Sequence, residues 1–167
     1  MNDLLLIVTI FICLITDIKN QKIYNNVLFP ALITGIVINI VNGGLIGLKE
    51  SLLGFIIGIV FLLIPFIYGG IGGGDVKLLA TIGAIKGYSF ALYSCVLTGI
   101  SGGLIALIIL IYNGKLIKTF SAILKGFYIM LITKFKVISF EGDGEKIMFP
   151  FGIAITMGVA ITYAMLW

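Results

Sequence analysis

Six apolar runs separated by short polar connections constrain this chain more than any other feature. They cover residues 4–16, 27–41, 52–68, 76–85, 90–112 and 148–167. A transmembrane helix needs about 20 apolar residues, and 60% of the 167 residues are hydrophobic whereas only 11% are charged, a composition typical of membrane proteins. We therefore predict an all-α, polytopic membrane protein with six transmembrane helices in a single membrane-embedded domain, residues 1–167.

The fourth run is short, and its end decides the count of six. Lys86 and Gly87 separate it from the fifth run. Joining the two runs would give an apolar helix much longer than the bilayer core is thick. We therefore expect a break at Lys86 and Gly87. Between the second and third spans, we expect a short outer loop that contains Lys49 and Glu50.

The basic residues, all lysines, set the orientation. Basic residues concentrate in cytoplasmic loops, and nine of the eleven fall on one side of the six-span arrangement: Lys19, Lys22, Lys77, Lys115, Lys118, Lys125, Lys134, Lys136 and Lys146. Lys49 and Lys86 lie on the other side. We place the nine-lysine side in the cytoplasm and both termini outside the cell membrane. The lysines that give the net charge of +4 therefore set the membrane topology, and we expect no nucleic-acid partner.

The connection between the fifth and sixth spans has a helical pattern of its own. Apolar side chains recur at steps of three and four residues, which predicts an amphipathic helix: Leu116, Phe120, Ile123, Leu124, Phe127, Tyr128 and Leu131. Lys115, Lys118 and Lys125 lie off this stripe. A helix of this kind lies in the cytoplasmic interface, where its lysines meet anionic membrane lipid.

The chain contains no histidine, which excludes many reaction classes. Zinc peptidases of the H-E-x-x-H type and nucleophiles activated by histidine both need that side chain. The two cysteines, Cys13 and Cys95, lie singly in apolar runs and do not form a metal-binding motif. We expect neither a metal nor a cofactor, which leaves the chemistry of carboxyl, lysine and hydroxyl groups.

Two of the seven acidic residues lie at membrane boundaries. Asp17 follows the first apolar run and Asp75 precedes the fourth, so the predicted topology brings both to the cytoplasmic face. A carboxylate there is costly unless it has a partner or a function. Taken singly, Asp17 could pair with Lys19, and Asp75 could cap its helix. Taken together, they could share one proton and act as the acid and base of an aspartic protease.

The residues before Asp75 are rich in glycine. Five of the six residues from 69 to 74 are glycines, which leave the backbone open to an extended peptide substrate. A flexible turn would not need an aspartate leading directly into an apolar helix. We therefore favour a functional interpretation of this segment.

Three stretches together resemble the prepilin and preflagellin peptidases, which are membrane aspartic proteases. Residues 72–78, GGGDVKL, resemble the G-x-G-D-x-K-L signature of the family. Residues 17–19, DIK, with Ile23 and Asn25, resemble its first-aspartate motif. Residues 150–154, PFGIA, resemble the P-Y-G-x-A opening of its last span. Tyr24 replaces a frequent proline and Phe151 a frequent tyrosine, and the chain lacks the C-x-x-C insertion of bifunctional members, so it resembles the short, peptidase-only branch.

The resemblance implies a function and a set of site residues. Asp17 and Asp75 would be catalytic, and the supporting or substrate-binding residues would be Gly72, Gly73, Gly74, Lys77, Lys19, Asn25, Pro150 and Gly152. The partner would be a prepilin-like or preflagellin-like precursor whose short basic leader is removed on the cytoplasmic side. Because Asp75 opens a helix and Asp17 closes one, the helix dipole favours Asp75 as the ionised base and Asp17 as the acid. A proton- or cation-coupled transporter is the alternative, although it predicts internal repeats that we do not find.

Overall fold

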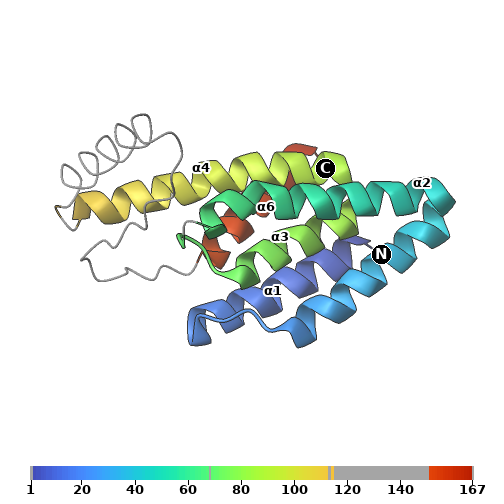
Figure 1. Ribbon diagram of the computed structural model, residues 1–167, viewed down its shortest axis with the longest axis horizontal. Helices are drawn as coiled ribbons and strands as arrows, with labels where there is room; N and C mark the ends of the chain where they lie inside the picture. Colours follow the sequence, from blue (N-terminus) through green and yellow to red (C-terminus); the bar gives the residue numbers. More distant parts are fainter. Residues whose placement is uncertain (1, 68, 113, 115–150, 167) are drawn as a thin grey trace. The chain divides into compact units, whose positions relative to one another are not determined.

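The computed structural model describes residues 2–67, 69–112, 114 and 151–166. These residues form α-helices and no strand, in the order α1 (Asn2–Asn20), α2 (Asn25–Ile67), α3 (Gly73–Lys86), α4 (Tyr88–Tyr112) and α6 (Gly152–Leu166) (Figure 1). The described part of the chain is therefore all-helical, as predicted. The amphipathic helix predicted between residues 116 and 131, the six lysines from Lys115 to Lys146, and Pro150 lie outside the described residues.

The chain divides into two compact units. The first contains Met1–Gly102 together with Pro150–Trp167, and the second contains Gly103–Phe149. Helices α1, α2, α3 and α6 belong to the first unit, as does α4 as far as Gly102. Asp17, Asp75 and Gly152 all lie in this first unit.

Helix α2 contains the second and third apolar runs and bends sharply between them. The backbone at Gly44 has φ 56° and ψ −134°, which is outside the helical region, and α2 doubles back at this bend (Figure 1). The predicted outer loop is therefore wrong, because Lys49 and Glu50 lie within the helix. Glycine accepts a positive φ at little cost, so one residue can reverse the chain without a loop.

Helix α3 forms the core of the first unit. Ten of its 14 residues are buried, which is typical of a helix enclosed by other helices. Glycines on α2 allow the two backbones to approach closely. A Cβ atom at Gly58 would lie 2.6 Å from the Cα of Ala80, and one at Gly54 would overlap the carbonyl of Gly83. Small residues at helix contacts are characteristic of membrane bundles.

Side chains of α2 hold the last turn of α3. The Asn39 amide donates to Ser51 Oγ at 2.7 Å and to the carbonyls of Ala84 and Ile85 at 3.0 and 3.1 Å. Ser51 Oγ donates to the Ala84 carbonyl at 2.7 Å. Carbonyls in the last turn of a helix have no partner within the helix, so these contacts supply the missing donors. Asn39 is a polar residue within the apolar run 27–41, and asparagine side chains in membrane helices commonly bond to a neighbouring helix.

The predicted break between the fourth and fifth runs is confirmed. Helix α3 ends at Lys86, Gly87 has φ 88°, and α4 begins at the next residue. Lys86 Nζ donates to Asp3 Oδ1 at 2.7 Å and lies 5.2 and 5.4 Å from the ring centroids of Phe90 and Tyr163. This ion pair joins the beginning of α1 to the end of α3.

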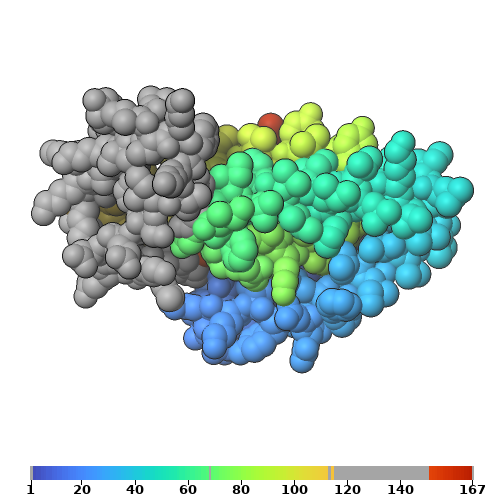
Figure 2. Space-filling model, viewed as in Figure 1, coloured from blue at the N-terminus to red at the C-terminus, as the bar shows by residue number. Residues whose placement is uncertain are grey.

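The outer faces of the helices are apolar, as expected for a protein solvated by lipid. Helices α2 and α4 are long and apolar enough to cross a membrane. The side chains of α1 and α2 cover much of the face drawn in Figure 2, and the large exposed apolar residues of these two helices include Leu4, Ile7, Phe11, Phe29, Val37, Val41, Leu45, Ile56 and Ile64. Soluble proteins rarely expose so much contiguous apolar surface.

Candidate aspartic dyad

Asp17 begins the last turn of α1 and is almost completely buried. Only 6% of the surface of Asp17 is exposed. The carboxyl Oδ2 accepts a hydrogen bond from the backbone N–H of Gly152 at 3.0 Å. The alternative interpretation of Asp17, as a simple partner of Lys19, is therefore not needed to account for its position, and Lys19 itself is exposed.

Asp75 lies in the first turn of α3 and is also buried, with 7% of its surface exposed. Its Oδ2 accepts the backbone N–H of Gly72 at 3.2 Å. Its Oδ1 is buried, and no hydrogen-bond partner for it exists among the described residues. Buried polar atoms are nearly always hydrogen-bonded, so an unpartnered one indicates a functional role or an absent partner.

The two carboxyl groups influence each other electrostatically. Both residues lie outside the apolar runs 4–16 and 76–85. Burial raises the pKa of Asp75 to about 6, and the charge of Asp17 adds to this rise. Burial also raises the pKa of Asp17, against the opposing effect of the Gly152 N–H. Two coupled carboxyls of this kind titrate as a pair, and one of them can retain a proton near neutral pH.

Further contacts join the first and second motifs. Lys77 Nζ donates to Asn25 Oδ1 at 3.0 Å, so two of the predicted supporting residues are direct partners. A Cβ atom at Gly74 would lie 3.0 Å from Ile23 Cβ, so the segment between α1 and α2 packs against the glycine run. The end of α1 and the starts of α3 and α6 lie toward the same end of the first unit (Figure 1).

The glycine run is less open than the sequence suggested. Gly72 is extended, with φ −75° and ψ 148°, but Gly73 and Gly74 already belong to the first turn of α3. Asp75 is therefore the third helical residue and not the residue that precedes the helix. Within this run, a positive φ occurs at Gly69, where φ is 73°. Helix formation through Gly74 directs the Asp75 carboxyl back toward the N–H of Gly72.

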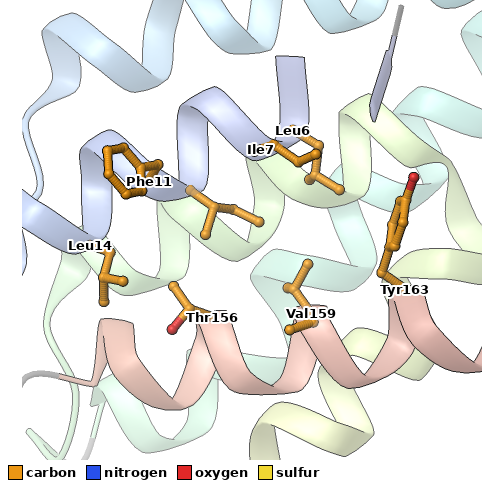
Figure 3. A pocket seen from close by; sticks show the side chains of 9 residues that line it. Leu6, Ile7, Phe11, Leu14, Thr156, Val159 and Tyr163 are labelled. Carbon is orange, nitrogen blue, oxygen red and sulfur yellow. The ribbon is translucent and has the colours of Figure 1, made fainter. Parts of the chain in front are cut away.

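An apolar pocket lies between α1 and α6, apart from the two carboxyls (Figure 3). Its volume is about 320 Å³, and its lining consists of Leu6, Ile7, Ile10, Phe11, Leu14, Thr156, Val159, Ala160 and Tyr163. No acidic or basic side chain lines it, so the pocket supplies no acid–base chemistry. Among the described residues, no group of three or more histidine, cysteine or acidic side chains could hold a metal ion.

A comparison with known families decides the assignment. The model of the type IV leader peptidase family matches residues 4–107. The chain belongs to this family. It is therefore a leader peptidase, a hydrolase of the membrane, and the resemblance inferred from the sequence motifs is confirmed. Comparisons with curated proteins and with solved structures gave no match.

The matched segment includes both aspartates of this leader peptidase but not its third motif. Asp17 and Asp75 lie within residues 4–107, whereas Gly152 lies outside them. The contact between Gly152 and Asp17 is therefore information that the structure adds to the family match. Sequence motifs predicted Gly152 as a supporting residue, but they did not indicate which side chain it contacts.

Proposed function

We propose that this leader peptidase is an aspartic endopeptidase whose acid–base pair is Asp17 and Asp75. The observation that carries the proposal is the presence of two buried, electrostatically coupled carboxyls at the adjoining ends of α1 and α3. Burying two carboxyl groups close together is unfavourable unless one is protonated. A shared proton is also what peptide hydrolysis by carboxyl groups requires.

The mechanism needs one water molecule and no other reactant. The ionised carboxylate takes a proton from water as the oxygen attacks the scissile carbonyl carbon, while the protonated carboxyl donates a hydrogen bond to the carbonyl oxygen. The tetrahedral intermediate then collapses. The C–N bond breaks, the departing amine receives a proton from the carboxyl that took it from water, and the pair returns to its starting state of one proton.

The substrate is a precursor related to type IV prepilins, tight-adherence prepilins or archaellins. Its short basic leader lies on the cytoplasmic side and is followed by a hydrophobic helix in the membrane. We place the dyad at the cytoplasmic face of a six-span protein with both termini outside, because most of the lysines lie on that side. A site at this depth suits a cut between the leader and the helix.

Family membership favours a peptidase over the transporter alternative. Both aspartates also lie at helix ends, in the last turns of α1 and the first turn of α3. A coupling-ion site in a transporter lies near the middle of the bilayer. No observation on the described residues favours transport.

The test uses the purified full-length protein in liposomes and a synthetic precursor with a basic leader and an apolar helix. We expect a single cut at the junction between the two, identified by mass spectrometry of the released leader. A matched peptide with the same helix and an acidic leader serves as the control for leader recognition. Failure to cut the basic precursor, or cutting within the apolar helix, would contradict the proposal.

A further inference from the structure

Gly152 occupies the first position of α6 and uses its backbone N–H on another helix. The N–H groups of the first turn of a helix have no partner within that helix. That of Gly152 donates to Asp17 Oδ2 at 3.0 Å, a buried contact between residues 135 positions apart in the chain. The beginning of α6 therefore contacts the candidate catalytic carboxyl directly.

The contact depends on the missing side chain of Gly152. A Cβ atom at this position would overlap Asp17 Oδ2 and lie 3.1 Å from Asp17 Cγ. These distances are shorter than a normal van der Waals contact, and neither a backbone atom nor a buried carboxyl moves easily. Glycine thus permits an approach that any other residue would prevent.

The surroundings of the two carboxyls are alike in one respect and different in another. Each accepts one backbone N–H near a helix start, that of Gly152 for Asp17 and that of Gly72, at 3.2 Å, for Asp75. Such a donor favours the ionised carboxylate. The difference lies in the second oxygen, because Asp75 Oδ1 is buried without a partner among the described residues. A buried, unpartnered carboxylate oxygen is costly, and a proton on it removes that cost and provides a donor for the scissile carbonyl.

We propose that the backbone N–H of Gly152 positions Asp17 and holds it as the ionised base, which leaves Asp75 as the protonated acid. This inference rests on the proposed function and adds Gly152 to it as a positioning residue. It reverses the roles that the helix dipole alone suggested, because both carboxyls turn out to lie near helix starts: Asp75 at that of α3, and Asp17 at that of α6.

Among the described residues, few other ionisable groups lie on the elements around Asp17. Helix α3 carries Asp75, with Lys77 two residues further on and Lys86 at its far end, and α1 carries Cys13 and Lys19, with Lys22 just after it. Helix α6 has no acidic or basic side chain. The charged residues of α2, Lys49 and Glu50, lie near its bend. Gly152→Ala alters none of these groups, so we assign a change in the titration of Asp17 in that protein to the lost N–H contact.

The test follows the Asp17 carboxyl by infrared spectroscopy in an Asp75→Asn protein, where it titrates without its partner. Adding Gly152→Ala should raise the pH at which Asp17 ionises by about one unit, since a hydrogen bond to a charged group has about this effect. Gly158→Ala is the matched control. Gly158 lies on α6, as Gly152 does, but it packs against α4, where its Cβ would lie 2.5 Å from the Thr98 backbone nitrogen. An unmoved titration, or an equal shift in the Gly158→Ala protein, would overturn the proposal.

A second comparison needs no change at Gly152 and so survives if that variant fails to fold. The carboxyl of Asp17 in the Asp75→Asn protein should ionise at lower pH than that of Asp75 in the Asp17→Asn protein. The opposite order would overturn the assignment. Both measurements use inactive proteins and report ionisation alone, so an unexpected result would contradict the roles assigned to the two carboxyls but not the proposed peptidase activity. That activity would be contradicted by absence of cleavage by the unaltered protein.

Discussion

At the scale of single residues, the buried carboxyl groups that suit the candidate dyad to catalysis also lower the stability of the folded protein. Asp75 keeps a buried carboxyl oxygen without a partner among the described residues. Water would solvate that group in the unfolded chain, so burying its ionised form opposes folding. Functional sites commonly carry such costs, and removing them commonly stabilises the protein.

We therefore predict that Asp75→Asn stabilises the protein at neutral pH. The pKa of Asp75 rises from 3.8 to about 6 on folding. The folded state then binds more protons than the unfolded state between these values, and stability falls as pH rises through this window. Asparagine does not ionise, so the variant does not lose stability as the pH rises through this window. Its Tm in detergent should exceed that of the wild type at pH 7.5, by the equivalent of about 1–3 kcal/mol, and the difference should shrink toward pH 4. A lower Tm than wild type at pH 7.5 would contradict this account.

At the scale of helices, α3 is held at both ends by different interactions. Its first turn carries Asp75, and the next turn carries Lys77, which donates a hydrogen bond to Asn25. Its last turn is bound by Asn39 and Ser51 through the carbonyls of residues 84 and 85. Fixing the far end of the helix restricts the position of the Asp75 carboxyl at the near end. Precise placement of catalytic groups depends on supports of this kind.

Replacing Asn39 should loosen this support. Asn39→Ala removes one donor from each of the two carbonyls, although Ser51 Oγ still donates to that of residue 84 and Asn2 Nδ2 to that of residue 85. Two lost hydrogen bonds typically cost about 1–3 kcal/mol together. We expect a lower Tm in detergent and a reduced kcat. Asn42→Ala is the matched control, since Asn42 lies on the same helix but is exposed. Equal stability of the two variants would show that the contact does not support α3.

The sequence predicted the elements better than their connections. Apolar runs, and the interruption at Lys86 and Gly87, are local signals, and they located the helices within a few residues. A turn between the second and third runs was expected, but as a loop containing Lys49 and Glu50 and not as a bend at Gly44, because glycine and polar residues between two apolar runs are equally compatible with either. The choice depends on packing of the two arms of α2 against α3, which no local pattern encodes.

The candidate site shows the same limit. Motifs predicted Asp17 and Asp75 because each carboxylate is out of place at an apolar boundary. The partner of Asp17 is 135 residues away in the chain, and its contribution is a backbone N–H, which every residue but proline possesses. Only the fold distinguishes the N–H of Gly152 from the others. The glycine at that position was the available signal, but it did not reveal the partner.

At the scale of the whole molecule, the predicted topology places the α1–α2 connection in the cytoplasm and the α2 bend outside. Cysteine labelling can test this directly, because Cys13 and Cys95 are both buried and give little background. Lys22→Cys and Asn42→Cys introduce exposed thiols at the two positions. An impermeant reagent added to intact cells should label the second protein and not the first. Labelling of both from the same side would contradict the topology.

The most direct test of the central claim compares Asp17→Asn and Asp75→Asn with the wild type in the leader-release assay. Asparagine keeps the size and hydrogen-bonding shape of each side chain but cannot exchange the shared proton. Each variant should lose activity by about 10³-fold or more while remaining folded and inserted. Glu50→Gln, an exposed acidic residue, is the control and should cleave at close to the wild-type rate. Asp3 is unsuitable because it pairs with Lys86. Substantial leader release by either aspartate variant would contradict catalysis by this pair.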